Sequence, residues 1–189
     1  MAKVQVYAAV YDDLGLVLIG QKRHQNRFWQ GQLGLPDAKK KKVNVVNQSD
    51  QFCLPGGGLE QLSIPDGARK EFLEETGVAL GEPIARLTHM HTFEDGGGPF
   101  HLAMFKHRSI FALVETIQGN LKPSTLDGER PAGATVVDWE LQQVLAVDRM
   151  NLSHFLGNPV EPHKSGYRHA IDWYGRIAQY IEAMPALPA

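Results

Sequence analysis

The most informative part of this chain consists of two stretches, Leu54-Pro55-Gly56-Gly57-Gly58 and Glu71-Phe72-Leu73-Glu74-Glu75-Thr76-Gly77. The second stretch places three carboxylates at positions i, i+3 and i+4, which lie next to one another on one side of a helix. They immediately precede a glycine that is typical of a helix end, where the helix dipole is negative and disfavours anions. Like charges at i, i+4 cost a further ~0.2–0.5 kcal/mol. Folding alone gives no reason for this arrangement, whereas Mg²⁺, which takes oxygen ligands and brings phosphates with it, would justify it.

The helix that carries these carboxylates is predicted over residues 63–76. Ser63 is a good N-cap, and Pro65 lies in the first turn, where its missing N–H costs nothing. The apolar residues of this helix recur at i, i+4 and i+8, which predicts the buried stripe Ile64, Ala68 and Phe72. Three glutamates alone would also suit a solvated acidic helix face. The preceding glycine loop and the spacing up to Gly77 favour a metal site instead.

The rest of the chain predicts a mixed α/β fold. We expect a hairpin from strands at residues 4–11 and 16–20, and further strands at residues 52–54, 84–93, 100–105, 109–117 and 134–139. A short helix is predicted over residues 140–147, and an amphipathic C-terminal helix from Tyr167 to Ile181. Strands that alternate with few helices indicate a mixed sheet with helices on its faces.

The chain is expected to form a single domain over residues 1–189. We interpret residues 21–51, with their glycines, proline and lysine run, as a long excursion that holds a short hairpin of its own. Residues 148–189 are interpreted as a C-terminal helical extension.

Composition narrows the class of protein. The chain has 189 residues, of which 43% are hydrophobic and 21% charged, as in a globular domain. A net charge of −2 argues against a surface for a nucleic acid polymer. Cys53 is the only cysteine, which fits a reducing compartment. The sequence shows no signal peptide and no run of about 18 apolar residues, so we expect a cytoplasmic protein without a membrane partner.

Residues 56–78 resemble the Nudix box of the MutT-like Nudix hydrolases. The chain reads Gly-x5-Leu62-x7-Lys70-Glu71-Phe72-x-Glu74-Glu75-x-Gly77-Val78, and the family pattern is Gly-x5-Glu-x7-Arg-Glu-U-x-Glu-Glu-x-Gly-U, where U is bulky and apolar. The box is slightly degenerate, because Leu62 replaces a glutamate and Lys70 replaces an arginine. Lysine keeps the charge but loses the planar fork of arginine. Glu60 is a nearby carboxylate that can take over the missing acidic role.

The resemblance implies a Nudix-type α/β/α sandwich with a mixed sheet, plus the C-terminal amphipathic helix. It also implies hydrolysis of a nucleoside diphosphate linked to another moiety, with Mg²⁺ or Mn²⁺ as cofactor; a homodimer is common in the family. The residues that match the family's catalytic positions are Lys70, Glu71, Glu74 and Glu75. The metal ligands would be the three glutamates and a carbonyl of the glycine loop. Strict counting makes the box glycine Gly56, whereas anchoring on Leu54-Pro55 makes it Gly57, which we take as the ligand.

Two properties of the site follow from the residues themselves. The three glutamates repel one another, so at least one of them is predicted to have a raised pKa without metal. A general base often lies outside the box in this family. The candidates are Glu94, Glu115 and Glu129, and Glu115 ranks first because it lies near the end of an expected strand.

Two other classes of function remain open at this stage. One is a catalytically weak or silent Nudix-fold protein that binds a nucleotide. The other is a structural or interaction protein whose working surface is the C-terminal helix.

Overall fold

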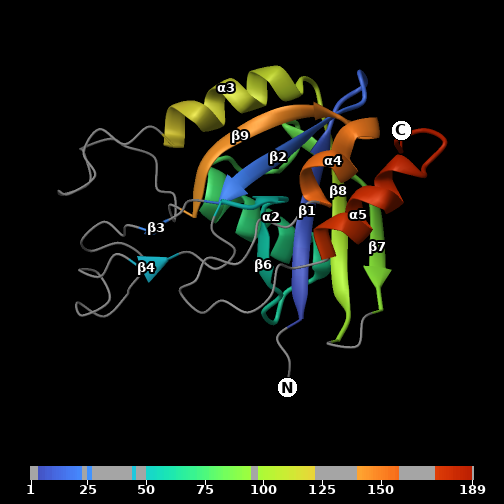
Figure 1. Ribbon diagram of the computed structural model, residues 1–189, viewed down its shortest axis with the longest axis horizontal. Helices are drawn as coiled ribbons and strands as arrows, with labels where there is room; N and C mark the ends of the chain where they lie inside the picture. The colour runs from blue at the N-terminus through green and yellow to red at the C-terminus, as the bar shows by residue number, and fades with distance from the viewer. Residues whose placement is uncertain are drawn as a thin grey trace.

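The computed structural model describes residues 4–22, 25–26, 44–45, 50–94, 98–121, 140–157 and 173–188. Figure 1 shows the elements of these ranges, which in chain order are β1 (Gln5–Tyr11), β2 (Leu16–Lys22), β3 (Gln25–Asn26), β4 (Asn44–Val45), β5 (Phe52–Cys53), β6 (Gly56–Gly58), α2 (Ile64–Thr76), β7 (Ala85–Phe93), β8 (Phe100–His107), α3 (Ile110–Leu121), β9 (Leu141–Asp148), the 3-10 turn η1 (Arg149–Asn151), α4 (Leu152–Leu156) and α5 (Trp173–Glu182).

A mixed sheet forms the centre of the described structure. Its strand order is β5-β2-β1-β8-β7, with β6 also paired to β1 and β9 also paired to β2. β1 runs parallel to β8 and antiparallel to β2 and β6. Every residue of β1 from Val6 to Tyr11 is buried, as expected for a strand covered on both faces. The predicted hairpin of the first two strands is confirmed, with Tyr11 opposite Val17.

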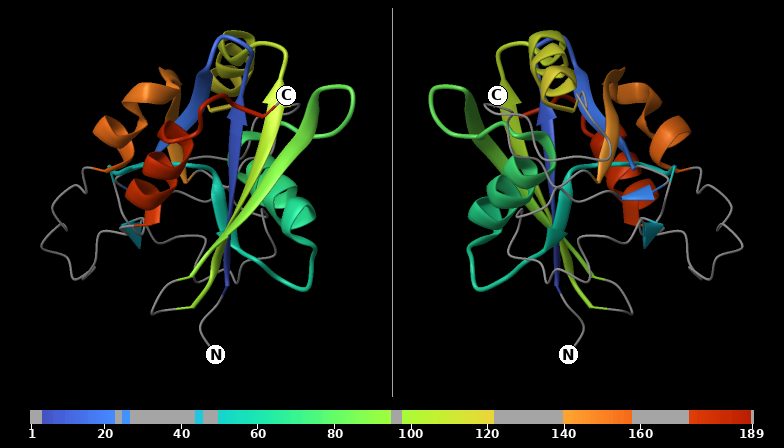
Figure 2. Two further views of the ribbon diagram at one scale, coloured as in Figure 1. Left: turned by 90° about the vertical axis from the view of Figure 1, so that its right-hand side faces the viewer. Right: turned by 90° about the vertical axis from the view of Figure 1, so that its left-hand side faces the viewer.

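Helices cover both faces of this sheet, which confirms the predicted α/β/α sandwich. α2 packs against β1, β8 and β7, while α4 and α5 lie on the opposite side, as Figure 2 shows. α3 packs on β9 and β2. In the described part of the chain, no helix has the length and apolar character needed to cross a bilayer.

The predicted amphipathic C-terminal helix is present as α5 from Trp173 on, whereas its predicted first residues, 167–172, lie outside the described residues. The apolar side of α5 packs on the chain's own core. Tyr174, Ile177 and Ile181 are buried. The Tyr174 ring lies 5.2 Å from the ring of Tyr7 in β1, in an edge-on contact. Trp173 stacks on Phe100 in β8 at 5.5 Å. These aromatic contacts hold α5 against the sheet of its own protomer.

Two predicted elements were wrong: a segment expected as a strand is a helix, and a segment expected as a helix is a strand. Residues 109–117 were expected as a buried strand but form the helix α3, in which Phe111 is 59% exposed. Residues 140–147 were expected as a short helix but form the strand β9, whose buried residues recur every third position. A spacing of three is also typical of a helix, but the long antiparallel pairing of these residues with β2 makes them a strand.

Only part of the predicted excursion over residues 21–51 lies within the described residues. β3 and β4 pair antiparallel within it, which agrees with a short hairpin there. The predicted strand at residues 134–139 lies outside the described residues, and so does most of the excursion.

Asp12 joins the turn after β1 to the start of α3. Its carboxylate is buried and accepts hydrogen bonds from the backbone N–H of Leu14 at 3.0 Å and of Leu16 at 3.2 Å. The other oxygen accepts from the N–H of Ile110 at 2.9 Å. The side chain thus satisfies donors in both the turn and the first turn of a helix, where a negative charge is also favourable.

We expect Asp12→Ala to lower the free energy of unfolding by about 2–4 kcal/mol, because it leaves buried N–H groups without an acceptor. Asp13→Ala is the matched control: Asp13 is 78% exposed and pairs with Lys106, so the loss should stay below about 1 kcal/mol. Urea unfolding followed by circular dichroism measures both. Equal losses would contradict the role assigned to Asp12.

Candidate active site

The helix α2 is fixed by local signals, as predicted. Ser63 caps its N-terminus by accepting a hydrogen bond from the N–H of Asp66, and Gly77 ends it with a left-handed φ of 72°. Ala68 and Phe72 are fully buried and fix the rotation of the helix about its axis. That rotation directs Glu71 and Glu75, one turn apart, toward the glycine segment β6.

Glu71 lies against Gly57. A Cβ atom at Gly57 would collide with the Glu71 carboxylate, which supplies all three of the nearest heavy atoms. At Gly56 the obstacle is different, because a Cβ there would meet the backbone and ring of Tyr7 and the carbonyl of Val6. Gly57 is therefore needed for the close approach of a carboxylate, and Gly56 for the pairing of β6 with β1.

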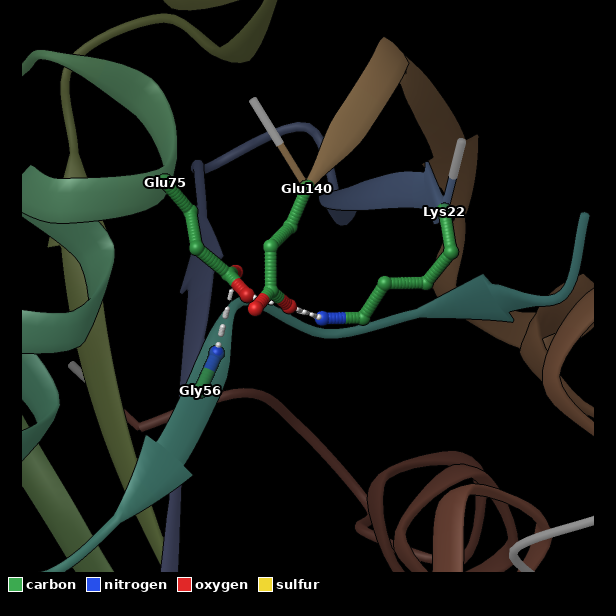
Figure 3. Close-up of polar contacts among 4 residues, drawn as sticks. All are labelled: Lys22, Gly56, Glu75 and Glu140. Carbon is green, nitrogen blue, oxygen red and sulfur yellow. Dashed lines mark hydrogen bonds and ion pairs between the residues drawn. The ribbon is translucent and has the colours of Figure 1, made fainter. Parts of the chain in front are cut away.

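Glu75 lies in the interior and is held from two sides (Figure 3). Its Oε1 accepts from the Lys22 ammonium at 2.9 Å, and its Oε2 accepts from the Gly56 N–H at 3.2 Å. The same ammonium contacts Oε2 of Glu140 at 2.6 Å. A buried lysine thus connects a carboxylate of α2 with one that immediately precedes β9.

The electrostatics of this cluster confirm that one glutamate has a raised pKa, with a different leading cause. Burial raises the pKa of the Glu75 carboxyl to about 7; Lys22 opposes the rise, and Glu140 and Glu71 add to it. Burial alone would lower the pKa of the Lys22 ammonium, but Glu75 and Glu140 raise it well above its usual value. Desolvation therefore matters more here than the mutual repulsion expected from the sequence.

Lys70 lies on the more exposed side of the site. Its ammonium lies 3.2 Å from Glu74, 3.6 Å from Glu60 and 3.9 Å from Glu71. Glu60 therefore reaches the lysine that replaces the family's arginine, while Leu62 is 41% exposed. The structure brings Lys70 and the three glutamates onto one side of α2, with Gly57 beside Glu71.

Sequence reasoning missed Lys22 and Glu140. Lys22 was assigned to the start of the excursion, and Glu140 to the first residue of a helix that does not form. One usable signal was the alternation in β2, because Lys22 continues the series Leu16, Leu18 and Gly20 and so puts a charge on one face of a buried strand. No local signal marks Glu140.

Among the described residues, no hydrogen bond or ion pair joins the candidate general bases Glu94 and Glu115 to this cluster. Glu115 does not end a strand, because it lies exposed on α3. Glu94 is exposed after β7, and Glu129 lies outside the described residues. Within the described ranges, no three His, Cys, Asp or Glu side chains are already placed to hold a metal ion.

A NUDIX domain family model matches residues 1–173, so the chain belongs to the Nudix family. A search of curated proteins found no significant match. The solved structures similar to this chain include an Ap4A hydrolase binary complex from C. elegans, with 10% identity over 95% of this chain and 96% of that one and a TM-score of 0.49. A MutT protein from Methanosarcina mazei Go1 has 15% identity, 96% coverage of both chains and a TM-score of 0.44. The NUDIX domain of Shewanella oneidensis NrtR, complexed with ADP ribose, has 12% identity, covers 82% and 78%, and has a TM-score of 0.39.

We expect Gly57→Ala to displace the Glu71 carboxylate and to weaken Mn²⁺ binding several-fold, because both residues are expected metal ligands. The melting temperature should change little, since the colliding group is the end of a flexible side chain. Gly81→Ala is the control, because a Cβ there meets nothing within 4 Å. Electron paramagnetic resonance of free Mn²⁺ measures the affinity. Unchanged affinity in Gly57→Ala would contradict the placement of a metal beside Glu71.

Proposed function

We propose that the protein hydrolyses the phosphoanhydride bond of a nucleoside diphosphate linked to another moiety, with Mg²⁺ or Mn²⁺ as cofactor. The observation that carries the proposal is the convergence of two box glutamates on β6. Glu71 lies against Gly57, and Glu75 accepts from the N–H of Gly56. Two carboxylates one turn apart thus meet a segment of three glycines, which has no side chains of its own.

The chemistry of the donor atoms suits such a metal ion, and the side chains would have to move to hold it, because no three of them are already so placed among the described residues. All of the donors are oxygens, which Mg²⁺ and Mn²⁺ prefer, and a lysine ammonium already occupies a cation position on Glu75. Glu71, Glu74, Glu75 and the carbonyl of Gly57 would hold the ion. When bound, the ion would neutralise the diphosphate and lower the pKa of a bound water.

The chain's own residues would orient this ligand set. The Gly56 N–H fixes the Glu75 carboxylate, and Lys70 restrains Glu74. Phe72, fully buried, keeps α2 from turning. Hydrolysis would give a nucleoside monophosphate or a similar fragment and a second phosphorylated product.

A second candidate is a Nudix-fold protein that binds a nucleotide with weak or no turnover. The observation that favours it is the pairing of Glu75 with Lys22, which compensates this carboxylate without a metal. The loss of a box glutamate at Leu62, which lies exposed, points the same way.

A substrate panel separates the two candidates. The protein is incubated with Mg²⁺ or Mn²⁺ and a range of nucleoside diphosphate derivatives, and a coupled phosphatase reports the phosphate released. Turnover of at least one compound supports the hydrolase. Nucleotide binding without turnover across the panel would favour the silent binder.

We expect Glu75→Gln to abolish turnover and to weaken Mn²⁺ binding, because the amide keeps the shape of the side chain but loses the anionic ligand. The protein should stay folded at reduced stability, because Lys22 keeps its contact with Glu140. Glu82→Gln is the control, since Glu82 is exposed between α2 and β7. Circular dichroism checks the fold. Wild-type turnover in Glu75→Gln would refute the assignment of this ligand.

Lys70→Arg should leave turnover equal or raise it. Arginine restores the family residue and can hold two carboxylates at once through its planar fork, and Glu74, Glu60 and Glu71 all lie within 4 Å of the lysine nitrogen. Steady-state kinetics on the best panel substrate measure the effect. A large loss would mean that the site is built around lysine.

A further inference from the structure

Lys22 is a buried cation at the centre of the candidate site. Lys22 is only 5% exposed. Its ammonium contacts two carboxylates that come from different parts of the fold, Glu75 in α2 and Glu140 before β9. A charge this deep requires partners, and the two partners found among the described residues are both acids. The proposed hydrolysis uses Glu75 but gives Lys22 no role.

We propose that Lys22 is a tethered cation that occupies Glu75 in the metal-free protein, and that it leaves Glu75 for Glu140 when a divalent cation binds. Lys22 thereby sets the affinity of the site for metal. This inference rests on the metal site of the proposed function.

The contacts of Glu75 explain why the two cations compete. One carboxylate oxygen accepts from Lys22 and the other from the Gly56 N–H, so both oxygens are already engaged. A dication on the same carboxylate would lie close to the ammonium, in an interior where repulsion is screened less than in water. Binding is therefore easier once the ammonium has moved.

The backbone of Lys22 is fixed, so the side chain is the part that can move. Its N–H donates to the carbonyl of Gln51 at 2.9 Å, and its carbonyl accepts from the N–H of Asp50 at 3.1 Å. Lys22 lies opposite Leu141, next to Glu140, because β9 carries an extra residue, Gln142, between the partners of Gln21 and Lys22. Four methylene groups then give the ammonium its reach.

Glu140 is suited to receive the ammonium. Its oxygen lies at 2.6 Å, closer to the lysine nitrogen than that of Glu75, and its side chain is 39% exposed, against 2% for Glu75. The ammonium can therefore move toward solvent without losing an acidic partner. In Figure 3 both carboxylates point toward the tip of Lys22.

The test measures Mn²⁺ affinity by electron paramagnetic resonance at constant ionic strength. Lys22→Met keeps the bulk of the stem and removes the charge, and should bind Mn²⁺ roughly tenfold more tightly or better. Glu140→Gln should bind Mn²⁺ several-fold more weakly, because Lys22 then has Glu75 as its only acidic partner among the contacts shown. In the double variant the effect of Glu140→Gln should vanish. Lys106→Met, which removes a lysine paired with Asp13, should leave the affinity unchanged.

The rise in melting temperature caused by Mn²⁺ gives a second readout. It should be larger in Lys22→Met than in the wild type, because the metal then compensates a carboxylate that has lost its lysine. If Lys22→Met does not fold without metal, Glu140→Gln decides, and an unchanged Mn²⁺ affinity in that variant overturns the inference.

The remaining outcomes separate this inference from the proposed function. Equal Mn²⁺ binding by the wild type and Lys22→Met overturns the inference and leaves the metal site intact. A loss caused by Glu140→Gln that persists beside Lys22→Met makes Glu140 a metal ligand and also overturns it. Absence of Mn²⁺ binding in every protein overturns both the metal site and the inference.

Discussion

The structure depends on keeping a carboxylate, Glu75, in the interior of the molecule. Removing one partner from a buried ion pair costs about 3–5 kcal/mol, because the remaining charge is left uncompensated. Glu75 is compensated by Lys22, 53 positions away in sequence, and by the N–H of Gly56, 19 positions away. Lys22 in turn reaches Glu140, at a separation of 118 positions. Satisfying this one group therefore requires α2, β6, β2 and the start of β9 to converge. The contacts that stabilise the fold here are thus the same contacts that form the site.

The sheet provides the place for this convergence. β1 and β2 are paired at Tyr11 and Val17, but farther along each strand takes a different partner. β1 continues with β6 and β2 with β5, so the segment from β5 to β6 passes from one strand to the other (Figure 1). The Ala8 N–H donates to the carbonyl of Pro55 at 2.9 Å and ties the middle of that segment down. Lys22 and Glu75 meet beside it, where the two strands no longer bond to each other.

The sequence predicted what is decided locally. The bounds of α2 follow from Ser63, Pro65 and Gly77, whose effects act within a turn of the helix, and the structure confirms them. The helix at residues 110–121 was missed because its apolar run looks like a strand, although Phe111 faces solvent. β9 was missed because its pairing with β2 outweighs its own pattern. The contact of Lys22 with Glu140 was beyond sequence reasoning for the same reason, since only the register of those two strands brings the residues together.

The three glutamates of the box turn out to be unequal, although the sequence presents them as one cluster. Glu74 is 37% exposed beside Lys70, Glu71 lies against Gly57, and Glu75 is buried with Lys22. Any dication that binds here competes with two ammonium groups whose surroundings differ. Lys70 is 35% exposed and can turn into water at little cost. Lys22 is buried, so in the exchange proposed above its release from Glu75 depends on its second acidic partner, Glu140. In the exchange proposed above, the buried lysine, rather than the more exposed one that replaces the family's arginine, therefore controls the charge balance of the site.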